Sequence, residues 1–317
     1  MTAITPSSTS TSAAIDVARD APLGKKLSAT LGSSRGKVFV WLLAILWTVP
    51  TFGLLVTSFR PERQIKSTGW WMVFAHPQVT LNNYVQVMGK ESGVDLGHPF
   101  LNSFKIVLPS VFISVALALL ASYAFSWMTW KGRDWVFVGV VALLVVPLQM
   151  AIIPLLKLFN NGAHIGSVPV FPPLPFNHSV FPVWIAHAVF GLPFCIFILK
   201  NFIASLPSEL IEAGKIDGAG HMKIFSGIVL PLSVPSIASL TIFQFIFIWN
   251  DFFVGKIFGG EENKPVTAAL VSLSGSRGQA WQLLTAAAFV STIVPLVVFF
   301  SLQRYFVKGL LAGSVKG

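Results

Sequence analysis

Six long apolar runs constrain the fold of this chain more than any other feature of its sequence. A segment needs roughly 20 apolar residues to cross the hydrocarbon core of a membrane, and all six runs meet that length. Because lipid offers no hydrogen bonds, a lipid-facing backbone must satisfy its own, as an α-helix does. The sequence therefore predicts an all-α, polytopic membrane protein with six transmembrane helices, at about 38–58, 101–128, 135–158, 180–199, 224–250 and 283–303.

The charge content agrees with a membrane protein and excludes several other classes. Only 11% of the residues are charged, whereas soluble domains contain roughly 25%. The net charge of +10 is not gathered in a basic helix or interleaved with aromatic residues, so we expect it to flank membrane helices and not to bind nucleic acid. The histidines lack metal-ligand spacing, and no ATPase motif is present. We therefore expect no metal, no cofactor and no catalytic residue.

Prolines interrupt two of the six runs. Pro147 and Pro154 lie in the third run, and Pro231 and Pro235 lie in the fifth. Proline has no backbone N–H and its ring clashes with the preceding helical turn, so kinks or re-entrant bends are expected at these places.

The distribution of lysine and arginine predicts the orientation. Residues 1–37 are rich in Ser, Thr and Ala and then basic, so we predict a disordered cytoplasmic tail, followed by a single transmembrane domain at 38–317. With both termini inside, the predicted cytoplasmic segments contain 13 Lys and Arg, and the outer loops contain 7. Basic residues are enriched in cytoplasmic loops. Both termini and the segment 205–223 are therefore predicted to lie in the cytoplasm.

A charged stretch separates the fourth and fifth runs. It begins ELIEAGKIDGAGHMK at Glu209 and contains six ionisable residues in fifteen. Pro207 and Ser208 are typical of a helix start, with Ser208 as the N-cap, and Gly218 and Gly220 are typical of its end. Such a short helix, at about 208–218, is marginal alone in water and needs a docking surface. It is either a docking element or a connector on the membrane surface.

The spacing around this helix resembles that of the inner-membrane permeases of bacterial ABC importers. Their pattern is Glu-Ala-Ala, three residues, Gly, nine residues and Ile-x-Leu-Pro. This chain has Glu212-Ala213-Gly214, then Gly218, then Ile228-Val229-Leu230-Pro231, with Gly214 in place of the third-position alanine. The resemblance implies the type I ABC importer permease fold and a coupling helix that docks into the cytoplasmic ATPase. The docking positions that it implies here are Glu212, Ala213, Gly214 and Gly218.

Longer segments resemble one group within that family. The C-terminal SLQRYFVKGLLAGSVKG, together with SFRPERQIKSTGWW and NSFKIVLPSVFISVALALLASYAFSW, is similar to MalG-like permeases of the maltose-importer type, and in particular to alpha-glucoside permeases. The resemblance implies a second homologous permease, two ATP-binding subunits that hydrolyse the ATP, and an extracytoplasmic sugar-binding protein as partners. It also implies a place in the bacterial inner membrane, with the outer loop 252–280 reaching into the sugar-binding protein.

Polar residues inside the apolar runs are candidates for a sugar path. Gln149, Gln244 and Asn250 can pair with sugar hydroxyls, or they can form hydrogen bonds between helices without any ligand. The alternatives for function are a stand-alone ion-coupled secondary transporter, an intramembrane enzyme, and an ABC permease for a solute other than a sugar. The first two need titratable residues inside the membrane. Few are present, namely His187, Lys105 and Lys157.

Overall fold

The computed structural model describes residues 34–89, 95–174, 179–274 and 280–314, with side chains as far as Gln303 except those of Arg35 and Ser274. The predicted disordered tail therefore lies outside the described residues up to position 33. Its last four residues, 34–37, belong instead to helix α2 (Ser34–Ser58), which begins before the predicted start at 38. The chain forms two units, residues 1–54 and 55–317, and each is described by itself.

The first unit contributes most of α2, which covers the first apolar run. Its sequence has hydrophobic residues on every side, as in a helix surrounded by lipid. Gly36–Ser58 is long and apolar enough to cross a membrane.

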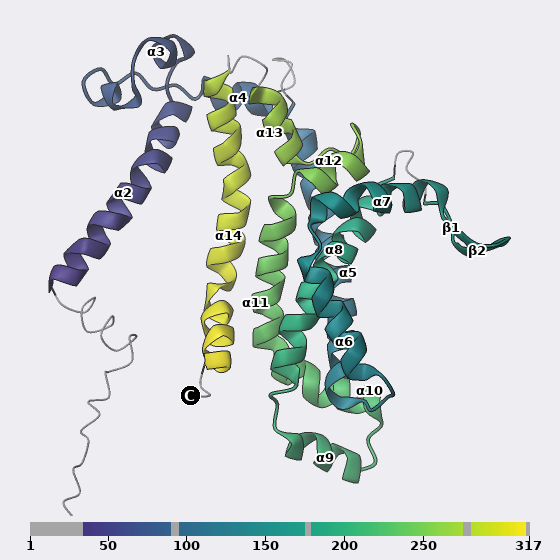
Figure 1. The fold of residues 1–317 in the computed structure, drawn as a ribbon. Coiled ribbons are helices and arrows are strands. Elements are labelled where there is room, and N and C mark those ends of the chain that lie inside the picture. The colour runs from purple at the N-terminus through teal and green to yellow at the C-terminus, as the bar shows by residue number, and fades with distance from the viewer. Residues whose placement is uncertain (1–33, 90–94, 175–178, 275–279, 315–317) are drawn as a thin grey trace, which may run out of the picture. The chain divides into compact units, whose positions relative to one another are not determined.

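Four long helices form the body of the second unit (Figure 1). They are α5 (Gly97–Trp127), α8 (Phe181–Ile203), α11 (Leu230–Trp249) and α14 (Trp281–Ser314). α11 contacts the other three, and α5 also packs along α8. Three short helices precede them: α3 (Glu62–Ser67), the 3-10 helix η1 (Trp70–Phe74) and α4 (Asn82–Met88). α3 and α4 pack against α14.

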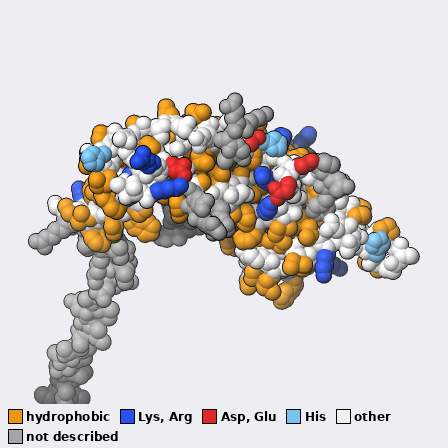
Figure 2. Space-filling view, turned by 90° about the horizontal axis from the view of Figure 1, so that it is seen from above, with side chains coloured by type: hydrophobic (Ala, Val, Ile, Leu, Met, Phe, Trp, Pro, Cys, Tyr) orange, Lys and Arg blue, Asp and Glu red, His pale blue; other side chains and the backbone are white. Residues whose placement is uncertain are grey.

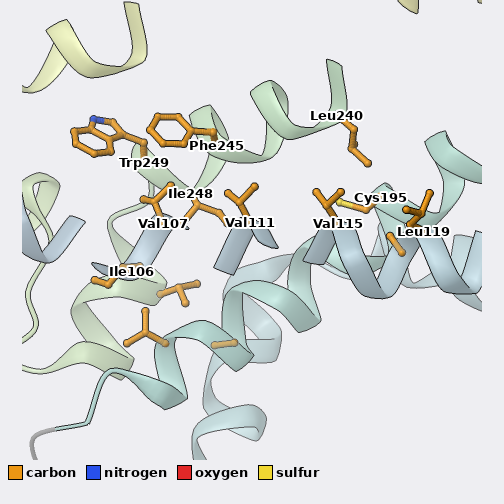
Figure 3. Packing of buried hydrophobic residues seen from close by; sticks show 14 of the residues in the cluster. Ile106, Val107, Val111, Val115, Leu119, Cys195, Leu240, Phe245, Ile248 and Trp249 are labelled. Atoms are coloured by element: carbon orange, nitrogen blue, oxygen red, sulfur yellow. The ribbon is translucent and has the colours of Figure 1, made fainter. Parts of the chain in front are cut away.

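The core lies between α5, α8 and α11. Figure 3 shows Val107, Val111 and Val115 of α5 in a row facing Ile248 and Leu240 of α11. Small residues let the helices approach closely, which is the main way that helices associate where lipid is as apolar as the side chains. One contact of this kind joins α5 to α8, where the Ser122 hydroxyl donates to the Ile196 carbonyl at 3.2 Å.

The third apolar run is broken at Pro147, one of the two prolines at which a bend was predicted. α6 (Arg133–Ala142) and the 3-10 turn η3 (Leu143–Val145) end before Pro147, and α7 (Leu148–Asn161) leaves at 108°. Val146 takes the extended backbone that a following proline favours. Pro154 lies inside α7. The expected break is thus found at Pro147, and the third predicted helix, 135–158, is two helices.

The fifth run is one helical path with an irregular turn. α10 (His221–Ile224) leads through a π-helical turn, η4 (Phe225–Val229), into α11. Pro231 directly follows this irregular turn, and a proline inside a helical path removes one of its i→i−4 hydrogen bonds. Among the described residues, five helices are long and apolar enough to span a membrane, or six if the bent pair counts as one. The predicted all-α architecture is confirmed.

Two connections between the long helices contain short elements of their own. The proline-rich segment after α7 contains a hairpin of β1 (Ala163–Ile165) and β2 (Val168–Phe171), whose base is fixed by the stacked rings of Phe159 and Phe171. The predicted loop 252–280 contains α12 (Phe253–Gly259) and α13 (Val266–Ser274). The Asp251 carboxylate starts α12 by accepting the Gly255 N–H at 2.9 Å, a cap that the sequence reasoning missed.

Candidate functional site

The charged stretch forms helix α9 (Ser208–Ile216), at one end of the bundle between α8 and α10 (Figure 1). The predicted N-cap is wrong by one residue. Pro207 has the non-helical backbone of a cap, with ψ at 127°, and Ser208 is already helical. No side chain caps the start of α9. Instead, the negative charge of Glu209 in the first turn interacts favourably with the helix dipole.

Gly218 lies at the end of this helix, as predicted. Its φ is +75°, a conformation that costs other residues roughly 1–2 kcal/mol. The Gly218 N–H donates to the Lys215 carbonyl at 3.0 Å, and the Ala219 N–H donates to the Gly214 carbonyl at 2.9 Å. This pair of bonds is the Schellman motif. A Cβ on Gly218 would meet no atom within 4 Å, so the backbone conformation, and not crowding within the chain, requires glycine.

One face of α9 is held against the start of the fifth membrane helix. Ile211 and Gly214 are buried. A Cβ on Gly214 would lie 3.1 Å from Cδ1 of Ile228 and 3.5 Å from Cγ1 of Ile224. The small size of Gly214 therefore lets α9 approach its own chain.

The opposite face of α9 is bare. Glu209, Glu212, Ala213 and Ile216 are exposed, and Ile216 is 85% exposed. Within the described part of the chain, Glu212 forms neither an ion pair nor a hydrogen bond. Carboxylates without a partner in this chain suit the polar rim of a surface that a protein partner covers.

A second contact ties this segment to α5, and the sequence reasoning missed it. The hydroxyl of Tyr123, which is buried on α5, lies 3.0 Å from Nδ1 of His221, the first residue of α10. The Tyr123 ring also packs edge-on against Phe225 at 5.3 Å. The stretch that follows α9 is therefore joined to two membrane helices.

The three predicted sugar-path residues are not brought together. Gln149 is exposed in the first turn of α7, and Asn250 is exposed at the end of α11, where its amide donates to the Ile246 carbonyl at 2.8 Å. Gln244 is buried between α11 and α8, and its Oε1 lies 3.6 Å from Cys195 Sγ. Gln244 thus fits the alternative interpretation, a polar contact between helices.

An apolar groove of about 420 Å³ lies between α6, α7, α8 and α11. Its walls are the elbow between α6 and α7, one side of α8 and Phe247 of α11. Pro147 and Phe190 line it, and none of the three predicted path residues does. The proline break that bends the third run therefore also shapes this groove.

A buried pair of titratable residues lies at the end of the bundle away from α9. Nε2 of His187 is 3.8 Å from Oδ2 of Asp251. Burial raises the pKa of Asp251, whereas hydrogen bonds from the backbone N–H groups of Gly255, Val254 and Phe253 lower it. The Asp251 carbonyl also accepts the Thr267 hydroxyl at 2.6 Å. These contacts join α8, α12 and α13 and explain the pair as part of the packing.

Comparisons with known proteins show the family of this chain. Residues 27–311 match the family of binding-protein-dependent transport system inner membrane components. The osmoprotective compounds uptake permease protein GgtD of Synechocystis sp. is 48% identical over 285 residues, which cover 88% of this chain and 91% of that protein. The alpha-glucoside transport system permease protein AglG of Rhizobium meliloti is 47% identical over 244 residues, which cover 76% of this chain and 61% of that protein.

The fold also matches a solved structure. A chain of a bacterial ABC transporter involved in the import of the acidic polysaccharide alginate superposes with a TM-score of 0.64. The match covers 86% of this chain and 98% of the other at 19% sequence identity. The matches in sequence show that this chain belongs to the family of binding-protein-dependent transport system inner membrane components and is an ABC-transporter permease.

Proposed function

We propose that this chain is one of two homologous transmembrane subunits of an importer that moves an alpha-glucoside or a related disaccharide across the bacterial inner membrane. The identity of 47% to an alpha-glucoside permease supports this substrate class. The relative that is named for osmoprotective compounds, 48% identical, favours an osmoprotective solute as the second candidate. In either case two separate ATP-binding subunits hydrolyse the ATP, and an extracytoplasmic binding protein delivers the solute.

The two unlike faces of α9 carry this proposal. The bare face, with Glu212 and Ala213, is the docking surface for an ATP-binding subunit. The opposite face is held by Ile211 and Gly214 against Ile224 and Ile228, which belong to the path into α11. A movement of the ATP-binding subunits is therefore passed to a membrane helix as a rigid-body displacement.

We place the sugar path along the apolar groove, with Gln149 and Asn250 as polar residues near it. Aromatic rings such as those of Phe190 and Phe247 suit the apolar faces of a sugar, and amides suit its hydroxyls. Gln244 remains a candidate for this path only if α8 and α11 separate during transport. Binding and hydrolysis of ATP would then shift the pathway between two conformations.

Two substitutions on α9 test the docking role. Glu212→Lys reverses a charge on the bare face, and Gly218→Leu puts a side chain where φ is +75°. Both are expected to reduce co-purification of the ATP-binding subunit and uptake of a labelled alpha-glucoside, with an osmoprotective solute measured in parallel. Glu62→Lys on α3 is the matched control, because Glu62 is exposed outside α9 and forms a surface ion pair with Lys66. Full retention of the ATP-binding subunit and of uptake in both α9 variants would show that α9 is only a connector.

A further inference from the structure

The turn between α5 and α6 gathers aromatic and basic residues to which the transport mechanism above gives no role. Trp127, Trp130 and Trp135 are three of the ten tryptophans of the chain, and they lie within nine residues. Trp130 is 41% exposed and Trp135 is 81% exposed. Two exposed indole rings next to the end of a membrane helix need an environment that is partly apolar and partly wet.

A surface cavity of about 290 Å³ lies at this turn. Its lining includes Trp130, Gly132, Arg133 and Trp135. Gly132 has a φ of +85° and turns the chain sharply into α6. Arg133 is held at the wall of the cavity, because its Nη1 donates to the Met128 carbonyl at 3.3 Å and its Nε lies 3.0 Å from Oδ1 of Asp134.

One polar group at this turn lacks a partner. The Trp127 Nε1–H is buried and forms no hydrogen bond with any described residue. A buried donor of this kind costs free energy unless an acceptor reaches it. Trp127 does not line the cavity, so the cavity itself relies on its charged groups and on the two exposed indole rings.

A cation of a second helix is linked to this turn through a row of aromatic rings. Nζ of Lys200, near the end of α8, lies 4.6 Å from the ring centroid of Phe137 on α6. The ring centroids of Phe137 and Phe125 are 5.5 Å apart, and those of Phe125 and Trp130 are 5.8 Å apart. Lys131, which is exposed in the turn, and Arg133 add two further cations, whereas Asp134 supplies one carboxylate. The local charge is net positive.

The position of the turn at the end of a membrane helix indicates which kind of ligand it binds. It directly follows the candidate span Gly97–Trp127, and the start of α6 lies at the same end of the bundle as α9 and α10 (Figure 1). Tryptophan rings and basic residues at the end of a span are typical of the membrane–water interface, and basic pockets there bind anionic lipid headgroups. A free anion would need the cations but not the exposed rings.

We propose that the α5–α6 turn is a binding site for the phosphate headgroup of an anionic phospholipid. Lys131, Arg133 and Lys200 attract the phosphate, and Trp130 and Trp135 lie against the glycerol and the upper acyl chains. The bound lipid links the ends of α5, α6 and α8 just before the chain enters α9. It thereby steadies the base from which α9 projects.

Native mass spectrometry of the full-length protein, with the subunits that co-purify, tests this site. The protein is reconstituted with equal amounts of phosphatidylglycerol and phosphatidylcholine, and the lipids that remain after delipidation are counted. The wild-type protein is expected to retain phosphatidylglycerol in preference to phosphatidylcholine. Lys131→Gln is expected to lower the affinity for phosphatidylglycerol about fivefold, the usual contribution of one basic residue near an anionic surface.

Lys157→Gln is the matched control, because Lys157 is exposed on α7, away from the turn. Lys131 is the better test residue than Arg133, which also holds the turn through Met128. Equal retention of the two lipids by the wild-type protein, or equal affinities of the Lys131→Gln and Lys157→Gln variants, would overturn the proposal. Loss of the lipid preference in millimolar inorganic phosphate would assign the site to a free anion and would also overturn it.

Discussion

At the scale of single residues, Gln244 fills the space that Gly191 leaves where α8 and α11 meet. A Cβ on Gly191 would collide with the Gln244 side-chain amide. The other side of the same amide lies against Cys195, which is four residues further along α8 and so on the same face. Gly191 and Cys195 thus form a shallow recess for one side chain, and the contact depends on the absence of a methyl group.

Gly191→Ala is therefore expected to destabilise the protein by about 1–3 kcal/mol, the usual cost of an overpacked core. Thermal unfolding of the purified protein in detergent measures the effect. Adding Gln244→Ala to the same chain should restore part of the loss, because the shortened side chain no longer meets the new methyl group. Gly139→Ala on α6 serves as the control, since a Cβ there meets no atom within 4 Å.

Thermal unfolding and sugar uptake, measured on the same variant, separate packing residues from path residues. Gln149→Leu should leave the unfolding temperature unchanged and lower sugar uptake, because Gln149 is exposed.

The Gly191 prediction has its own contradicting outcome. If Gly191→Ala left the stability unchanged, or if the double variant were no more stable than Gly191→Ala, the recess would not be a tight contact.

Polarity in an apolar run was enough to single out Gln244, but it could not give the role of the residue. A path residue and a helix-packing residue carry the same signal in one sequence, since both are polar and both lie in a predicted span. The small residues Gly191 and Cys195, spaced four apart on the facing helix, were an available signal for packing. The Tyr123–His221 bond had no such signal, because its two residues are 98 positions apart.

At the scale of secondary structure elements, α9 packs closely against the start of the fifth membrane helix. Gly214 sets that distance. A methyl group on Gly214 would lie 3.1 Å from Cδ1 of Ile228, the flexible end of a side chain that can shift by a few tenths of an ångström. A branched side chain has no such room, because Ile224 closes the other side.

Gly214→Ala is therefore expected to keep normal uptake and to gain up to about 1 kcal/mol of helix propensity. Gly214→Leu should push α9 away from Ile224 and Ile228, so that ATP hydrolysis continues while uptake falls. Uptake and ATPase activity of the reconstituted complex are measured side by side. Equal uptake by the alanine and leucine variants would mean that the contact does not transmit movement.

Local signals predicted the elements well wherever the chain itself fixes them. The break in the third run follows from Pro147, and the end of α9 follows from Gly218, because both residues restrict the backbone directly. The segments 252–280 and 163–171 were not predicted as helices and strands. Their order depends on distant partners, as when the Ser103 hydroxyl accepts the Val266 N–H at 2.9 Å. Contacts over such separations are not visible in one sequence.

At the scale of the whole molecule, charged side chains lie at both ends of the second unit. The end that carries α3, α12 and α13 shows acidic side chains beside basic ones (Figure 2). Lys256 and Lys264 both pair with Glu261, and the hydrogen bond and charge of Lys256 lower the pKa of Glu261. The other end carries α9, the α5–α6 turn with its exposed Lys131, and the described end of α14 (Figure 1).

This arrangement fits the orientation that the lysine and arginine distribution predicts, with α9 in the cytoplasm. Ser167, at the tip of the β1–β2 hairpin, and Ser208, at the start of α9, are both exposed. Ser167→Cys is expected to react with a membrane-impermeant thiol reagent added to intact cells. Ser208→Cys should react only after the cells are opened. The wild-type protein supplies the background, because its single cysteine, Cys195, is buried.

Each result decides between the two possible orientations. Labelling of Ser208→Cys in intact cells would place α9 outside the membrane, where no ATP-binding subunit can reach it, and the docking role would fail with the orientation. Labelling of Ser167→Cys alone would leave Glu212 and the bare face of α9 on the side where ATP is available. It would also put the phospholipid site on the cytoplasmic leaflet, next to the surface that the ATP-binding subunits approach.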